Sequence, residues 1–148
     1  MARECFEDVA VGETREFGSR DVTREEIVEF AGRYDPQPFH TDATAAGESM
    51  FGGLIASGWH TAAMTMELLV TNVFEGSAAT GAVGVDELRW PNPVRPGDTL
   101  SVRTEVLDTE SWSDRLGLVR SETTTENQDD ETVMSMVGLV LYERRDPE

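Results

Sequence analysis

Hydrophobic positions recur with helical spacing in the first third of the chain. The members of this apolar stripe are Ile27, Phe30, Ala31 and Tyr34, spaced i, i+3, i+4 and i+7. Thr23 and Glu26 stand just before it with the spacing of a capping box, in which each side chain hydrogen-bonds the other residue's backbone N–H. Because proline cannot continue a helix, Pro36 should end this one. The pattern therefore predicts a helix that begins after Thr23 and stops at the Asp35-Pro36 step.

A second helical pattern follows the small-residue passage at 50–58, with Ser57 as the predicted N-cap. Its stripe consists of Trp59, Ala62, Ala63, Met66, Leu69, Val70 and Val73. Glu67 is the only charged residue between positions 57 and 74, and the other faces carry further apolar and threonine residues. A helix this apolar on all sides is typical of a buried central element.

Alternation with period two predicts strands in the remainder of the chain, and also at 14–21. The alternation changes parity between Val85 and Leu88, which predicts a β-bulge near 86–87. The later predicted strands are 100–106, 112–125 and 133–142, with a hairpin turn at 126–131. The last strand is apolar on both faces, which favours a central place in the sheet. We predict an α+β fold in which antiparallel strands wrap one buried helix, and a single domain over 1–148.

The charge balance restricts the partners of the protein. The 148 residues include 29 Asp and Glu against 12 Lys and Arg, a formal net charge of −17, and all twelve cations are arginine. This balance argues against binding nucleic acid or an anionic membrane through a broad charged surface. It leaves room for a local arginine pocket that binds a phosphorylated ligand. An excess of carboxylates without lysine favours a halophilic cytoplasm, where salt screens self-repulsion.

The chain carries few signals of secretion or membrane insertion. Cys5 is the only cysteine, so an intrachain disulfide is impossible and a reducing interior fits. The N-terminus carries acidic residues where a signal peptide would be hydrophobic. The uncharged stretch 49–66 is rich in Gly, Ser and Thr, which does not suit a membrane span. We expect a cytoplasmic protein with no membrane contact.

The stretch 34–42 holds the most suggestive chemistry. Asp35 and His40 flank Pro36 and Pro38, so the backbone between them is predicted to be stiff and non-helical. A carboxylate and an imidazole at the ends of a rigid loop can form an acid/base pair. The alternative is a helix-ending turn with a capping Asp and a surface His. The residues of this stretch alone leave both interpretations open.

Other polar and aromatic residues have simpler interpretations. Asp42 is predicted to cap the next helical turn, and His60 to be a core or pocket-wall residue. The two histidines lack metal-ligand spacing, so we predict no metal site. No G-x-G-x-x-G fingerprint is present, which argues against a nicotinamide cofactor. The aromatic residues assigned to the core are Tyr34, Phe39 and Trp59.

Three stretches together resemble the MaoC-like dehydratases, relatives of the (R)-specific enoyl-CoA hydratases. The family motif D-x-N-P-x-H corresponds to 35–40, and it is commonly followed by x-D, here Thr41-Asp42. A glycine-rich passage into the central helix corresponds to 51–60, and a third stretch, P-V-R-P-G-D-T-L, to 93–100. Gln37 replaces the motif's Asn, which keeps the amide but adds a methylene. We expect this change to shift geometry or substrate preference more than to abolish chemistry.

The resemblance implies a hot-dog fold, with an antiparallel sheet around a long central helix. It implies an enoyl-CoA hydratase/3-hydroxyacyl-CoA dehydratase of fatty acid metabolism, with an acyl-CoA substrate and no other cofactor. It also implies a homodimer or a dimer of dimers, with active sites near the subunit interface. The alternatives are a hot-dog acyl-CoA thioesterase and a non-catalytic acyl-thioester-binding protein.

The same resemblance implies residue roles. Asp35 and His40 become the catalytic dyad, which activates water and shuttles its proton. Gly58, at the predicted start of the buried helix, becomes the backbone donor to the thioester oxygen; otherwise it is a packing glycine. Three further residues are candidates for the substrate pocket: Gln37, Ser57 and His60.

Overall fold

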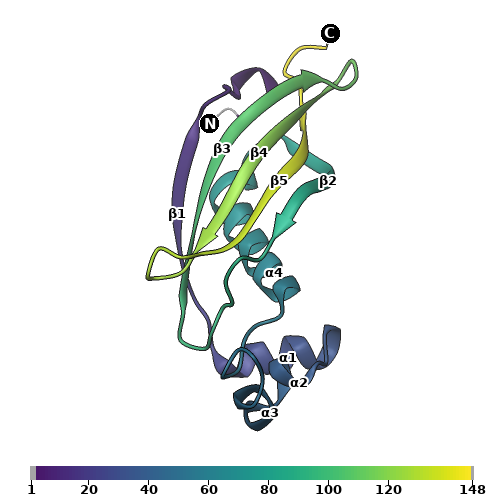
Figure 1. The fold of residues 1–148 in the computed structure, drawn as a ribbon. Coiled ribbons are helices and arrows are strands. Elements are labelled where there is room, and N and C mark those ends of the chain that lie inside the picture. Colours follow the sequence, from purple (N-terminus) through teal and green to yellow (C-terminus); the bar gives the residue numbers. More distant parts are fainter. Residues whose placement is uncertain (1–2, 148) are drawn as a thin grey trace.

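The computed structural model describes residues 3–147 and builds them around a five-stranded antiparallel sheet (Figure 1). The strands are β1 (Thr14–Asp21), β2 (Ala79–Arg89), β3 (Thr99–Ser111), β4 (Leu116–Glu126) and β5 (Thr132–Glu143). They pair in the order β1-β3-β4-β5-β2. The helices are η1 (Phe6–Asp8), α1 (Arg24–Tyr34), α2 (Pro38–Thr41), α3 (Ala43–Gly47), α4 (Gly58–Leu69) and its π-helical continuation η2 (Val70–Phe74).

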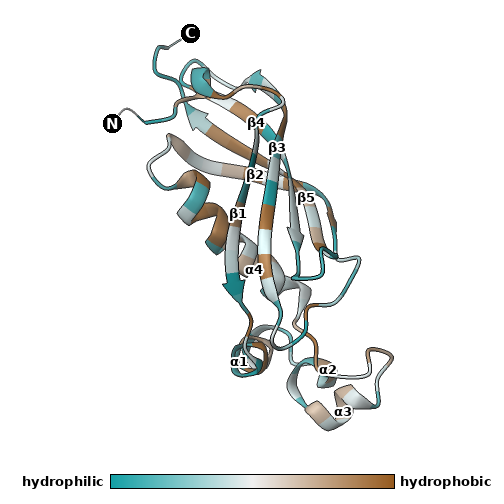
Figure 2. Ribbon diagram, turned by 90° about the vertical axis from the view of Figure 1, so that its left-hand side faces the viewer, coloured by the Kyte–Doolittle hydropathy of each residue, from teal (hydrophilic) through white to brown (hydrophobic). Residues whose placement is uncertain are grey.

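The sheet curves around α4, and α1, α2 and α3 gather at one end of it (Figures 1 and 2). Both ends of the described chain lie toward the opposite end (Figure 1). This arrangement confirms the predicted hot-dog fold, an antiparallel sheet wrapped around a helix. It places the 35–57 connection, which contains the D-x-Q-P-x-H stretch, at the N-terminal end of the central helix.

The first helix forms as its sequence predicts. Thr23 accepts a hydrogen bond from the Glu26 N–H, and the Glu26 carboxylate accepts one from the Thr23 N–H, so the capping box is complete. Ile27 and Ala31 are fully buried on the inner face of α1. The last intrahelical bond runs from the Asp35 N–H to the Ala31 carbonyl, immediately before Pro36. The helix therefore delivers Asp35 at a defined point.

The central helix buries a different face from the one predicted. Its buried residues are His60, Thr61, Met64, Thr65, Leu68 and Leu69. Trp59, Met66 and Val70 of the predicted stripe are exposed in the single chain. The inner face of α4 includes polar residues. Thr65 can be buried there because its hydroxyl hydrogen-bonds the hydroxyl of Thr125 on β4, with 2.7 Å between the two oxygens. No helix of the described chain 3–147 is long and apolar enough to cross a membrane.

The strands follow the predicted order with local differences. The register between β2 and β5 shifts between Asp86 and Arg89, and Glu87 has a positive φ of 53°, which confirms the predicted bulge. The last strand lies between β4 and β2, as expected for a segment apolar on both faces. The predicted strand at 112–125 was too long, because residues 112–115 form the β3–β4 turn.

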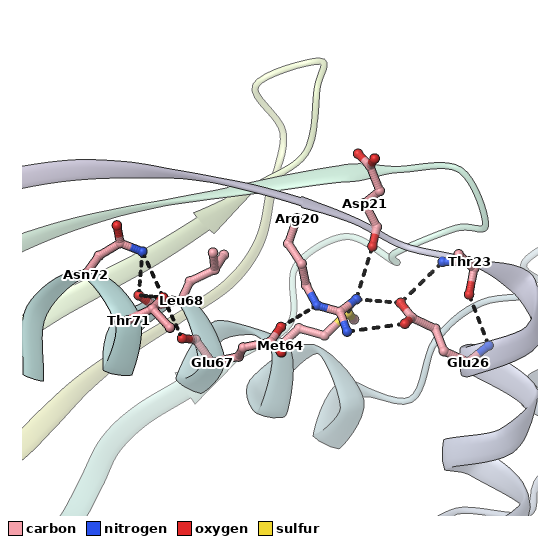
Figure 3. A network of polar contacts seen from close by, with 9 residues as sticks. All are labelled: Arg20, Asp21, Thr23, Glu26, Met64, Glu67, Leu68, Thr71 and Asn72. Atoms are coloured by element: carbon pink, nitrogen blue, oxygen red, sulfur yellow. Dashed lines mark hydrogen bonds and ion pairs between the residues drawn. The ribbon is translucent and has the colours of Figure 1, made fainter. Parts of the chain in front are cut away.

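An arginine joins the sheet to both long helices (Figure 3). Arg20 on β1 donates to both carboxylate oxygens of Glu26 on α1, and its Nε donates to Glu67 on α4 at 2.6 Å. The Arg20 side chain is only 24% exposed, so these charges are partly shielded from water. Arg20 thereby holds α1, and the Asp35 that follows α1, in a fixed relation to α4.

We predict that Arg20→Met lowers the free energy of unfolding by about 1–3 kcal/mol, because it leaves Glu26 partly buried without its cation. The measurement is denaturant unfolding at fixed ionic strength. Arg103→Met is the matched control, since Arg103 makes one exposed 3.4 Å pair with Glu126. The control should change stability by less than about 0.5 kcal/mol. Equal losses in the two variants would show that Arg20 has no special structural role.

Candidate active site

The Asp35–His40 stretch is a tight turn followed by one turn of helix. Asp35 caps the C-terminus of α1, and the Gln37 N–H donates to the Asp35 carbonyl at 2.8 Å. Pro38 occupies the first position of α2, where its missing N–H costs nothing. The prediction of a non-helical backbone up to His40 was therefore wrong, because Pro38 begins a helix as readily as Pro36 ends one. The short helix turns His40 inward, and only 4% of the residue is exposed.

The Asp35 carboxylate has a defined partner on each oxygen. Its Oδ1 accepts a hydrogen bond from the Gln37 amide at 2.6 Å. Its Oδ2 accepts one from the Ser57 hydroxyl at 2.7 Å and lies 3.3 Å from His40 Nε2. Gln37 is therefore long enough to reach the carboxylate directly, despite its extra methylene. The structure brings Asp35, His40, Gln37 and Ser57 together in one cluster.

The His40 ring is oriented by the backbone of the glycine-rich passage. Its Nδ1 lies 2.7 Å from the Ile55 carbonyl oxygen, which can only accept, so Nδ1 carries the hydrogen. In the neutral ring, Nε2 is then unprotonated and faces Asp35 Oδ2. The arrangement presents a lone pair and a carboxylate oxygen side by side. A water molecule within reach of both would have two acceptors for its protons.

The electrostatics of the cluster keep Asp35 ionised. Burial alone would raise the pKa of the Asp35 carboxyl, but the hydrogen bonds from Gln37 and Ser57 and the nearby His40 outweigh it. The net result is a pKa below the ordinary value of an aspartic acid. Asp35 is therefore a carboxylate at neutral pH and attracts positive charge toward the His40 ring.

The first turn of α4 completes the cluster. Ser57 is fully buried and caps the helix, because its Oγ accepts the Trp59 N–H at 3.2 Å while its hydroxyl donates to Asp35. Gly58 follows as the first helical residue, where backbone N–H groups lack intrahelical acceptors. A Cβ at position 58 would lie 2.5 Å from the Trp90 ring, so only glycine fits here. Gly58 therefore has a packing role, and its helix-terminal N–H remains a candidate donor to a ligand.

A cavity of about 330 Å³ opens beside the cluster. Asp35, His40 and Gly58 line it, together with four aromatic residues. These aromatic residues are Phe39, Phe51, Trp59 and Trp90. The sequence interpretation missed Phe51 and Trp90 as lining residues; the available signal was a tryptophan followed by Pro91 and Pro93 at the end of β2. A second cavity of about 380 Å³ lies between the end of α4 and the sheet, and no histidine lines it.

His60 lies behind the site. It stacks on Phe30 of α1 with ring centroids 4.7 Å apart, and it does not line the cavity. Its buried Nδ1 has no hydrogen-bond partner within residues 3–147. Burial is the main cause that lowers the pKa of His60. The nearby Glu26 raises this pKa and the nearby Arg20 lowers it, and the net pKa is below that of an ordinary histidine. His60 is therefore a neutral core residue that packs α4 against α1.

The remaining predictions for this region had mixed outcomes. Asp42 caps α3 through the Thr44 and Ala45 N–H groups, which confirms the capping interpretation. Phe39 packs against the core, as predicted. Tyr34 and Trp59, however, are 66% and 57% exposed in the single chain, so the prediction that they are core residues was wrong.

Comparison with known proteins finds relatives that cover almost the whole chain. The uncharacterized protein YdeM of Bacillus subtilis is 30% identical over 139 residues, which cover 94% of this chain and 99% of that protein. The crystal structure of a MaoC-like dehydratase from Rhodospirillum rubrum is similar, with a TM-score of 0.86 and 44% identity over 95% of this chain and 97% of that one.

A second solved structure, the R-hydratase PhaJ1 from Pseudomonas aeruginosa, has a TM-score of 0.77 and 25% identity. The similarity covers 97% of this chain and 88% of that one. Residues 7–128 match the family described as the MaoC like domain, a span that includes the whole Asp35–Gly58 cluster. The chain belongs to the MaoC-like domain family.

Proposed function

We propose that this protein is an enoyl-CoA hydratase/3-hydroxyacyl-CoA dehydratase, a hydro-lyase that adds water reversibly to a 2-enoyl thioester. The observation that carries the proposal is the convergence of Asp35 Oδ2 and His40 Nε2, 3.3 Å apart, on the wall of a cavity that also reaches Gly58. The similarity to an R-hydratase supports this reaction class over others available to the fold.

The proposed first step is activation of water. A water molecule held by Asp35 and His40 loses a proton to the pair as its oxygen attacks C3 of the enoyl chain. The His40 Nδ1–H donates to the Ile55 carbonyl, so Nε2 is the nitrogen that can take the proton. Asp35 remains ionised and stabilises the imidazolium that forms.

The second step returns the proton. Attack at C3 moves the electron pair of the C2=C3 bond toward the thioester, and negative charge develops on the carbonyl oxygen. We assign stabilisation of that charge to the Gly58 N–H and the N-terminal end of the α4 dipole. The proton held by the pair then bonds to C2. Water supplies both added groups, so no further reactant is required.

The proposal includes a homodimer in a halophilic cytoplasm. Exposed apolar residues lie on the central helix and on the edge strand β2: Met66 of α4, Val70 of η2, and Val83 and Val85 of β2. Exposed apolar side chains on a helix and an edge strand are the kind of surface that a second copy covers. Light scattering at high salt should give twice the chain mass of 16.3 kDa, or four times for a dimer of dimers.

We predict that Asp35→Asn and His40→Ala each lower kcat for hydration of a short trans-2-enoyl-CoA by about 100-fold or more, because each removes half of the water-activating pair. Loss of the enoyl absorbance measures hydration, and a thiol reagent detects the free CoA that a thioesterase would release.

Asp42→Asn is the matched control, since Asn also caps helices and Asp42 lies outside the cavity lining. Full hydration by both dyad variants would overturn the mechanism. Thiol release without hydration would favour the thioesterase, and tight acyl-CoA binding without turnover would favour a non-catalytic binder.

We also predict that Gln37→Met raises the pKa of the Asp35 carboxyl. The amide of Gln37 stabilises the charged form of Asp35, so its loss favours the protonated form. Asp35 then gains its proton at a higher pH as the solution is acidified, and an NMR titration of its carboxyl carbon measures the change. Gln37→Asn retains an amide and should shift this titration less. An unchanged pKa in Gln37→Met would show that this hydrogen bond does not control Asp35.

A further inference from the structure

Arg95 lies beside residues that line the cavity and is held there by two contacts. It follows Val94, a buried lining residue, in the 90–98 connection between β2 and β3. Its backbone N–H donates to Asp98 at 2.9 Å, and its Nη2 donates to the carbonyl of Phe51, another lining residue, at 2.8 Å. The side chain is exposed and bridges the two segments that border the cavity.

The guanidinium of Arg95 has no carboxylate partner among residues 3–147, although the chain is acidic. The arginines that form carboxylate ion pairs within the described chain include Arg3, Arg15, Arg20, Arg103, Arg120 and Arg145. The contact of Arg95 with Phe51 uses one N–H of a five-donor fork, and the other donors make no bond within the described chain. A protein with a net charge of −17 repels a polyanionic ligand. A local cation without a carboxylate partner would allow such a ligand to bind.

We propose that Arg95 binds a phosphate of the thioester substrate's carrier arm, at the cavity mouth, while the acyl thioester lies between Asp35 and Gly58. This inference rests on the proposed function and names the anchor of its substrate. A guanidinium recognises phosphate through paired N–H donors. The Phe51 carbonyl holds the fork in place beforehand, which lowers the entropic cost of ordering it on binding.

Arg89 is the competing cation, because it precedes the lining residue Trp90 at the end of β2. Its Nη1 donates to the Leu88 carbonyl of its own strand. This contact stays within its own strand, whereas the Arg95 contact reaches the lining residue Phe51. The geometry therefore favours Arg95.

The test measures binding of three butanoyl thioesters by calorimetry at fixed ionic strength, so that turnover plays no part. Pantetheine carries no phosphate, 4′-phosphopantetheine carries one, and CoA carries all of them. We expect Arg95→Gln to weaken binding of the CoA thioester about tenfold and to leave the pantetheine thioester unchanged. Arg115→Gln is the matched control, an exposed arginine in the β3–β4 turn at the far end of the sheet, and should change neither.

An equal loss with the phosphopantetheine thioester would assign the contact to the phosphate shared by CoA and carrier-protein arms. Loss with CoA alone would assign it to the nucleotide portion of CoA. Equal weakening of all three thioesters would overturn the proposal, because it would mean that Arg95 only supports the 51–53 loop. No change, an effect confined to Arg89→Gln, or wild-type binding without preference for phosphate would also overturn it.

The outcome is independent of the proposed reaction. Phosphate-dependent binding through Arg95 in a protein that does not hydrate enoyl-CoA would leave the anchor intact and reject the hydratase. Hydration that is equally efficient with CoA and pantetheine substrates, in both wild type and Arg95→Gln, would reject the anchor and retain the hydratase.

Discussion

The Ser57 hydroxyl makes the contact on which the site depends. It donates to Asp35 at the end of α1 and accepts from the Trp59 N–H at the start of α4. One fully buried oxygen thus caps the central helix and orients the carboxylate beside it. Because Ser57 is fully buried, loss of either hydrogen bond would leave a buried polar group without its partner, which costs free energy. The same side chain therefore caps α4 and fixes the position of the Asp35 carboxylate.

The segment 54–58 extends this coupling. The Ile55 carbonyl orients His40, and the Ala56 N–H bonds to the Val94 carbonyl at the cavity wall. Arg20 acts at the other end of α1, where it connects Glu26 to Glu67 on α4. Asp35 therefore follows a helix that is braced at its start by an ion pair and at its end by hydrogen bonds. This two-point attachment explains how a short, proline-rich turn can hold Asp35 and His40 in a defined geometry.

The sequence predicted the elements well where the signal was local. The capping box, the Pro36 stop, the bulge and the central position of the last strand all depend on adjacent residues. It failed for the buried face of α4, because the inward residues include Thr65, whose burial requires a hydrogen-bond partner from β4. It also missed Trp90 in the cavity, since the contact with Gly58 joins segments 32 positions apart. Features that depend on adjacent residues can be predicted from the sequence. Contacts between distant segments can be predicted only when the fold is known.

The chemistry that the site can support follows from the contrast between its two titratable groups. Asp35 accepts two hydrogen bonds, which stabilise its charge, and it is therefore a weak base that keeps its position. His40 gives its only N–H to a backbone carbonyl, which leaves the proton-accepting nitrogen on the Asp35 side. A base with a fixed tautomer beside a permanent negative charge suits a proton that leaves water and returns to carbon within one turnover. In the proposed hydration, an imidazolium at His40 persists only between those steps, and the neighbouring carboxylate would stabilise it.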